Sequence, residues 1–142
     1  MDDYKKYETD CERIKRENSV ILKQFAVWLL EKQLSESTIK NHVSNIDFYV
    51  NEFLLYEEAI EAKDGAYQID RFLGYWFIRK AMWSSVSQIK SNAASLKKFY
   101  TFMHEKNYIK QEELEQLNDR VKEDMPEWID TMKRYDEQGT LY

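Results

Sequence analysis

Residues 83–109 read WSSVSQIKSNAASLKKFYTFMHEKNYI, and this stretch decides the fold. Ser85, followed three residues later by Gln88, has the spacing of a capping box, worth roughly 1 kcal/mol over an uncapped helix start. Asn107 tolerates a left-handed backbone and predicts the helix end, with Ile109 packing back. Between them, apolar residues recur at three- and four-residue steps, which indicates an amphipathic helix. These residues are Ile89, Ala93, Leu96, Phe99, Tyr100 and Met103.

A second copy of this pattern lies fifty positions earlier. Ser37, Ile39, Lys40, Val43, Ile46, Tyr49, Val50 and Phe53 match Ser87, Ile89, Lys90, Ala93, Leu96, Phe99, Tyr100 and Met103. Any two amphipathic helices share an apolar stripe, so the common Ser-x-Ile-Lys opening is the stronger signal. The two segments together suggest a duplicated helical unit.

Length and composition favour a single helical domain. A chain of 142 residues with Gly 3 and Pro 1 lacks the residues that tight hairpins need, so helices joined by short loops are expected. Cys11 is the single cysteine, which excludes an internal disulfide and suits a cytoplasmic protein. No apolar run approaches the ~18 residues of a membrane span, and no apolar core behind basic residues appears near the N-terminus, so neither a membrane span nor a signal peptide is expected.

The periodicity predicts an all-α fold, a compact bundle of four to six helices built from two crossed helical hairpins. Residues 10–32 and 35–58 form the first hairpin, with Ser35 as the N-cap of its second helix and Leu34 stapled onto Ile39. A loop at 62–66 leads to a third helix from about Asp70, which pairs with the helix after Ser85. Gly74 inside the third helix costs about 1 kcal/mol relative to Ala, and a close helix crossing would explain it.

The two ends are expected to be less ordered. Residues 1–9 are polar and read as frayed or loosely docked. Residues 111–123 continue as a fifth helix, Pro126 suits the first turn of a short sixth helix, and residues 134–142 read as a tail. The expected division is a helical domain over 10–110 and a C-terminal extension with a tail over 111–142.

The charge is unevenly distributed along the chain, whose net charge is −5. Residues 65–106 carry two acids and seven bases, whereas 33–64 carry seven acids and two bases, and 107–142 carry ten acids and five bases. A basic surface is typical of phosphate-binding modules, and this layout places one between two acidic blocks. The acidic total argues against a strong nonspecific nucleic-acid binder.

Two spaced motifs carry a resemblance to a known family. They are Leu34-Ser35-x-x-Thr38-Ile39 with Ile46-x-x-Tyr49, and Ser84 with Ile89, Leu96-x-x-Phe99-Tyr100-x-Phe102-Met103 and Tyr108-Ile109. Over residues 10–110 this arrangement resembles the N-terminal core-binding, SAM-like domain of tyrosine recombinases and phage integrases. The resemblance implies a bundle that closes one side of a clamp around duplex DNA, in a protein of DNA recombination or integration.

The resemblance points to two helix starts as DNA-binding sites. The first holds Ser35, Thr38, Lys40 and Asn41, and the second holds Ser84, Ser87, Lys90 and Ser91, with Arg79 and Lys80 nearby and Lys97 and Lys98 further along the basic face. Helix N-termini present unpaired backbone N–H groups to phosphate oxygens, and each lysine that neutralises a phosphate releases counterions. The alternative is that these serines are caps and these lysines are solvated surface.

The family's chemistry does not carry over. Its catalytic half needs an arginine, a His-x-x-Arg element and a nucleophilic tyrosine, but His42 and His104 lack that arginine and Tyr135 and Tyr142 lack those partners. His42 reads as a surface residue without a second ligand at metal spacing. Glutamate pairs read as solvated faces, and Cys11 has no neighbouring histidine. No catalytic residue, cofactor or metal is expected.

The leading hypothesis is a non-catalytic DNA-binding module. Its rival is a protein–protein interaction or regulatory module that kept the bundle without the DNA role and uses its acidic blocks to meet a basic partner or a recombinase. An enzyme is the third and weakest option. Trp28, Trp76, Trp83 and Trp128 are expected in the core, except that Trp83 stands in a turn beside the basic cluster and could bind a partner.

Overall fold

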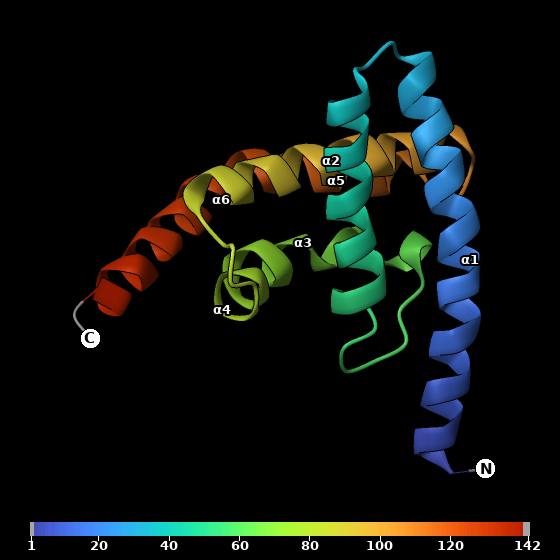
Figure 1. Cartoon of the computed structure of the whole chain (residues 1–142), viewed down its shortest axis with the longest axis horizontal. Helices are drawn as coiled ribbons and strands as arrows, with labels where there is room; N and C mark the ends of the chain where they lie inside the picture. The colour runs from blue at the N-terminus through green and yellow to red at the C-terminus, as the bar shows by residue number, and fades with distance from the viewer. Residues whose placement is uncertain (1, 141–142) are drawn as a thin grey trace. The chain divides into compact units, whose positions relative to one another are not determined.

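The structure is a computed structural model that describes residues 2–140, and it is helical, with no strand in that range. The all-α expectation is thereby confirmed. The chain divides into two compact units, and the boundary in the sequence falls between Gly65 and Ala66. Figure 1 shows the helices of both units. The expected division into 10–110 and 111–142 stays a prediction.

The first unit is built on a helical hairpin. The helices α1 (Asp3–Glu31) and α2 (Glu36–Phe48) run antiparallel beside each other (Figure 1), and the π-helical turn η1 (Tyr49–Phe53) continues α2. Ser35 caps α2 as expected, because its Oγ accepts from the backbone N–H of Thr38 at 3.3 Å. The core of this unit is the shared apolar side of the two helices: Ile14, Phe25, Trp28, Leu29, Ile46, Tyr49, Val50 and Phe53 are buried.

Three expectations for the first unit are wrong. Residues 3–9 are helical and not frayed, because Asp2 caps Tyr4 and the Tyr7 hydroxyl donates to the carbonyl oxygens of Leu55 and Tyr56. Burial raises the pKa of the Tyr7 hydroxyl above its ordinary value. The second helix ends at residue 53 instead of 58, and His42 is buried instead of exposed.

The change from α to π geometry explains where the second helix ends. Leu54 N–H donates to the carbonyl of Tyr49, five residues back, at 3.0 Å. The buried Asn18 of α1 donates through Nδ2 to the Val50 carbonyl at 3.3 Å and to Asn51 Oδ1 at 2.8 Å. A side chain on the neighbouring helix therefore supports the irregular turn, as such turns require.

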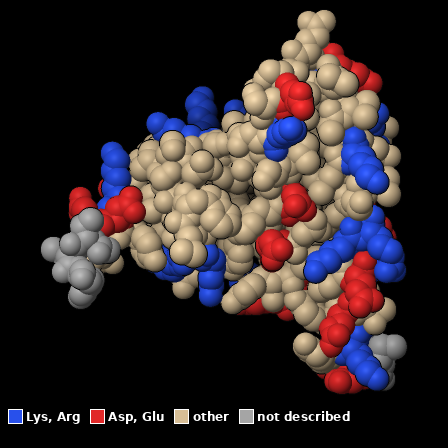
Figure 2. Space-filling model, in the orientation of Figure 1, with Lys and Arg blue, Asp and Glu red and all other residues tan. Residues whose placement is uncertain are grey.

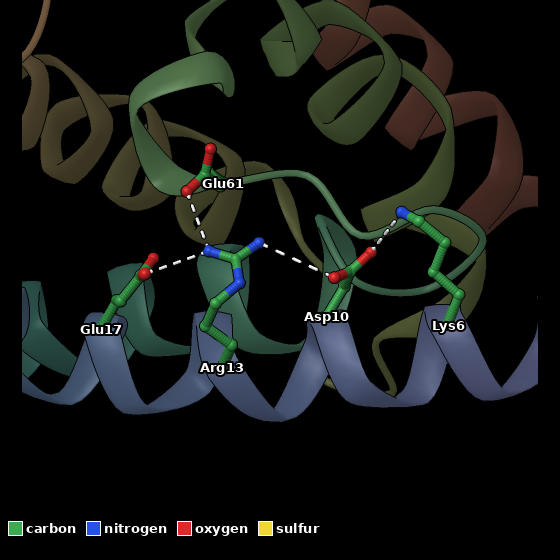
Figure 3. A network of polar contacts seen from close by, with 5 residues as sticks. All are labelled: Lys6, Asp10, Arg13, Glu17 and Glu61. Carbon is green, nitrogen blue, oxygen red and sulfur yellow. Dashed lines mark hydrogen bonds and ion pairs between the residues drawn. The ribbon is translucent and has the colours of Figure 1, made fainter. Parts of the chain in front are cut away.

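An ionic network on α1 holds the segment that follows η1 (Figure 3). Arg13 Nη1 lies 3.0 Å from Glu17 Oε1 and 3.3 Å from Glu61 Oε1, and Asp10 bridges Arg13 and Lys6. The hydrogen bonds to Glu17 and Glu61 raise the pKa of the Arg13 guanidinium. The segment 55–61 is thus held to α1 by Arg13 as well as by Tyr7. It leads into the 3-10 turn η2 (Ala62–Asp64), and the Gly65 carbonyl accepts from the Tyr49 hydroxyl at 2.6 Å.

The second unit contains two long helices and one composite helix. The composite runs through the 3-10 turn η3 (Ala66–Gln68), α3 (Ile69–Arg71), the π-helical turn η4 (Phe72–Trp76) and α4 (Phe77–Lys80). The long helices are α5 (Val86–Glu105) and α6 (Gln111–Thr140), which pack against each other and against η4. The helix α6 also packs against η3 and α3, so it contacts most of the unit.

The expected N-cap, C-terminal end and buried stripe of α5 are confirmed. Ser85 Oγ accepts from the N–H of Gln88 at 3.1 Å, and Asn107 has φ 63°. The N–H of Tyr108 bonds the carbonyl of Met103 and that of Asn107 bonds His104, the pattern of a Schellman motif. All six predicted stripe residues are buried, and so is Ile109. The helix α1 ends in the same motif at Gln33, with φ 64°, which the sequence interpretation missed.

The expected break at Pro126 is wrong, since Pro126 lies inside α6 and the helix continues to Thr140. Leu114, Leu117, Val121, Trp128 and Met132 form one buried face along it. A proline inside a helix costs about 3 kcal/mol, and burial of a large aromatic ring and a methionine beyond it offsets that loss. Of the expected tail 134–142, residues 134–140 are helical, and 141–142 lie outside the described residues.

Gly74 marks a close helix crossing, as expected. A Cβ on Gly74 would lie 3.0 Å from Cδ1 and 3.1 Å from Nε1 of Trp128, which comes from α6. The Trp128 ring is 1% exposed, and its Nε1 donates to Asp70 Oδ1 at 2.8 Å. The glycine therefore makes room for an indole that is held by a hydrogen bond on the same helical segment.

We expect Asn18→Leu to lower the free energy of unfolding by about 1–3 kcal/mol, because Val50 and Asn51 lose a buried donor. Chemical denaturation of the full chain measures this change. Ser19→Ala, at the neighbouring exposed position, is the control and should change stability little. Equal stability losses in the two variants would contradict the role assigned to Asn18.

We expect Gly74→Ala to destabilise the chain by about 1–3 kcal/mol through overpacking, although alanine ordinarily stabilises a helix. The comparison is a double-mutant cycle with Trp128→Leu, read by thermal and chemical unfolding. Removing the indole should abolish the penalty of the added methyl group. A penalty that is the same with and without the indole would refute the proposed steric cause.

Candidate nucleic-acid interface

The start of α2 holds the four predicted residues of the first unit, and most of their polar groups have partners in the fold. Ser35 Oγ caps Thr38 and lies 2.9 Å from Thr38 Oγ1. Lys40 Nζ pairs with Glu36 Oε1 at 3.2 Å, and Asn41 is exposed. Glu36 also places a negative charge in the first turn, where an anion would otherwise be favoured. This helix start is therefore electrostatically close to neutral.

The start of α5 differs in charge from the start of α2. Its first turn contains no acidic residue. Ser85 supplies the cap, Ser87 is exposed with its Oγ 3.2 Å from Ser85 Oγ, and Ser84 Oγ donates to the Ile78 carbonyl at 3.1 Å. Ser84 thus fastens the turn before α5, and Ser87 is the exposed predicted serine at this helix start.

The lysines of α5 stand on its solvent side. Lys90, Lys97 and Lys98 are exposed, and none of them forms an ion pair with another residue in the range 2–140. Lys90 and Lys97 are seven residues apart, so they lie nearly in line along the helix, roughly 10 Å apart at 1.5 Å per residue. Ser91, between them, is half-buried. We call Lys90, Lys97 and Lys98 the α5 basic face.

Two further cations, Arg79 and Lys80, lie in the last turn of α4. Arg79 and Lys80 are exposed, and the Arg79 guanidinium stacks over the Tyr75 ring with 4.1 Å between its carbon and the ring centroid. Arg79 Nη1 also donates to the Tyr75 carbonyl at 3.3 Å. This stacking holds the guanidinium against Tyr75 of η4 while leaving most of its donors open to an anion.

The sequence between positions 71 and 104 contains six bases and no acid. These bases are Arg71, Arg79, Lys80, Lys90, Lys97 and Lys98. The acids of the second unit lie mainly on α6, where Glu112, Glu115, Asp119, Glu123 and Glu127 are exposed along one side. We call these five residues the α6 acidic ridge. The unit therefore carries an acid-free basic segment and an acidic helix on separate elements.

Figure 2 shows how this charge appears on one side of the second unit. Lys and Arg atoms occupy its upper and lower margins in this view, and a wide band without charged groups lies between them. The cations therefore flank an uncharged surface instead of forming one continuous patch on this side. The expectation that this basic surface binds DNA stays a prediction.

Exposed apolar and aromatic residues outside the predicted DNA-binding set add to this region. Met82 is 98% exposed and Tyr75 is 57% exposed, both next to predicted cations. Trp83 is 54% exposed, whereas Trp28, Trp76 and Trp128 are buried, as expected. Exposed aromatic and apolar side chains beside basic groups are common where proteins meet partners. The signal in the sequence that points to this region is the run from position 71 to 104, which contains no acid.

The described residues hold no cluster of potential metal ligands and no helix fit to span a membrane. No group of three or more His, Cys, Asp or Glu between positions 2 and 140 is arranged to hold a metal ion. Within the same range, no helix has the length and apolar character needed to cross a membrane. Tyr135 is exposed on α6, and Tyr142 lies outside the described residues.

Comparison with known proteins assigns the chain to no family. No protein-family model matches it, and no match was found among curated proteins or among solved structures. The resemblance to the core-binding domain of tyrosine recombinases therefore stays a prediction that rests on its motif spacing.

Proposed function

We propose that this chain is a non-catalytic duplex DNA-binding module, comparable in role to the core-binding domain of tyrosine recombinases and phage integrases. The observation that carries the proposal is the α5 basic face, whose three lysines are exposed and without ion pairs in a segment free of acids. Unpaired lysines in line along a helix suit the regular spacing of backbone phosphates.

The start of α5 supports the same role. Its first turn has no acid, and Ser87 is exposed beside the cap. Unpaired N–H groups, a positive dipole end and a nearby lysine can bind a phosphate oxygen together. The start of α2 contributes less, because Glu36 pairs with Lys40. The main contact in this proposal is therefore made by the second unit.

The expected affinity is modest. The chain has a net charge of −5, and about four to five of its cations contact phosphates in this proposal. The expected dissociation constant therefore lies in the nonspecific range of ~10⁻⁴–10⁻⁶ M. Each contacted phosphate contributes a slope of about −0.9 to the dependence of log affinity on log salt. Stronger binding in the cell would come from dimerisation or from a catalytic partner bound to the same DNA.

We expect the affinity for a mixed-sequence duplex to fall about 10²-fold between 50 and 200 mM salt, because about four phosphates are neutralised. Fluorescence anisotropy titrations at several salt concentrations measure the slope. The variant Lys90→Glu/Lys97→Glu should weaken binding and make the slope shallower by about two units. Both side chains are exposed, so its melting temperature should stay close to that of the original chain.

The matched control is Lys122→Glu/Lys133→Glu, which changes the net charge equally on exposed positions of α6. It should bind DNA much more tightly than the α5 variant. Equal loss of DNA affinity in both variants would mean that the loss comes from net charge and not from the α5 basic face. Affinity that is absent, or independent of salt, would refute the proposal.

The second candidate is a protein-interaction module, which the α6 acidic ridge favours. Five exposed acids on one side of a helix are complementary to a basic partner surface. For this role, a protein partner should co-purify with the chain in a stoichiometric amount, and the complex should persist after nuclease treatment. The variant Glu115→Lys/Asp119→Lys/Glu123→Lys should then lose the partner, and the original chain should show no salt-dependent affinity for duplex DNA.

A further inference from the structure

The turn between α4 and α5 is held in one shape by its own hydrogen bonds. The N–H of Ala81 donates to the Phe77 carbonyl and that of Ser84 to the Ala81 carbonyl, each at 3.1 Å. Ser84 Oγ adds a third bond to the Ile78 carbonyl, also at 3.1 Å. Ala81 is buried, so the turn is anchored in the core at its first residue. The two residues at its tip are consequently presented by a rigid support.

Those two residues, Met82 and Trp83, are the apolar tip. Met82 is 98% exposed, so its side chain contributes almost nothing to the packing of the described chain. Trp83 packs one edge against the buried Phe77, with 6.4 Å between ring centroids and 77° between planes, while 54% of it stays exposed. The indole is thereby oriented by the core and still open to a partner.

The charges around the apolar tip identify the kind of partner. Arg79 and Lys80 precede it, the acid-free start of α5 follows it, and Lys90 and Lys97 continue in line along α5. Cations on the elements before and after an apolar tip fit the phosphates that flank one base step of a duplex better than a flat lipid surface. Proteins that kink DNA insert unbranched or apolar side chains such as methionine between base pairs, with cations on the flanking phosphates.

We propose that Met82 enters the base stack of duplex DNA as a wedge and that Trp83 packs beside it against the opened step. This inference rests on the proposed function, to which it adds a recognition mode: preference for duplexes that are easily unstacked. Opening a base step costs a few kcal/mol in a perfect duplex and less where a base is already mispaired. The module would thus select deformable sites without reading base sequence.

The test compares two duplexes of equal length, one perfectly paired and one with a central mismatch, by anisotropy titration at low salt. We expect the original chain to bind the mismatched duplex about 10-fold more tightly, since part of the unstacking is already done. Met82→Ser should bring that ratio close to one and leave the salt slope on the perfect duplex unchanged. Leu30→Ser, at an exposed apolar position of α1, should keep the ratio of the original chain.

The outcomes separate this inference from the function on which it rests. A ratio near one for the original chain, with salt-dependent binding intact, overturns the wedge alone. Failure to bind either duplex overturns both proposals. Met82 is too exposed for its replacement to unfold the chain, and circular dichroism of the variant verifies this. Binding to phosphatidylserine-containing vesicles that Met82→Ser abolishes, together with a ratio near one, would assign the tip to membranes and overturn the inference.

Discussion

The packing of Trp128 against Gly74 is the contact on which the second unit depends. The indole fits where a side chain is missing, and its N–H is held by Asp70 at 2.8 Å, so three residues fix the angle between α6 and the composite helix before it. That composite helix ends in α4, and α4 leads directly to the turn and to α5. The buried ring thus helps to place the cations of α4 relative to α6, and the direct packing of α5 on α6 places those of α5.

Charge separation within the second unit follows from the same packing. The helix α6 turns Leu114, Leu117, Val121, Trp128 and Met132 inward, which leaves its acids on the outside. The helix α5 does the same with its aromatic stripe and leaves its lysines on the outside. Because each helix buries its apolar face, the charged side chains stay in solvent. Neither the acids of α6 nor the bases of α5 need an ion pair across the contact between these two helices. The lysines of α5 stay without ion pairs among residues 2–140 for that reason.

Features that depend on a few neighbouring residues could be predicted from the sequence. The caps at Ser35 and Ser85, the left-handed end at Asn107 and the buried stripe of α5 are local, and each was confirmed. Exposure of Lys90 and Lys97 follows from the same helical period. The motif spacing alone could not show whether they meet DNA, and the crossing of the two hairpins stays a prediction.

Features that depend on residues far apart in the sequence could not be predicted from local sequence patterns. The π-helical turn η1 needs Asn18, thirty-two positions earlier, to bond the Val50 carbonyl. The helix continues through Pro126 because Trp128 and Met132 are buried beyond it. Nothing near Met82 in the sequence shows that its side chain points to solvent, since exposure depends on how Ala81 and Ser84 anchor the turn.

The two serine caps, fifty residues apart, share one geometry and differ in the residue that follows. Glu36 comes after Ser35, and Val86 comes after Ser85. If both helices descend from one ancestral segment, a single codon at this position separated their electrostatic character while the backbone stayed the same. The same capped backbone then favours an anion at the start of α5 and disfavours one at the start of α2.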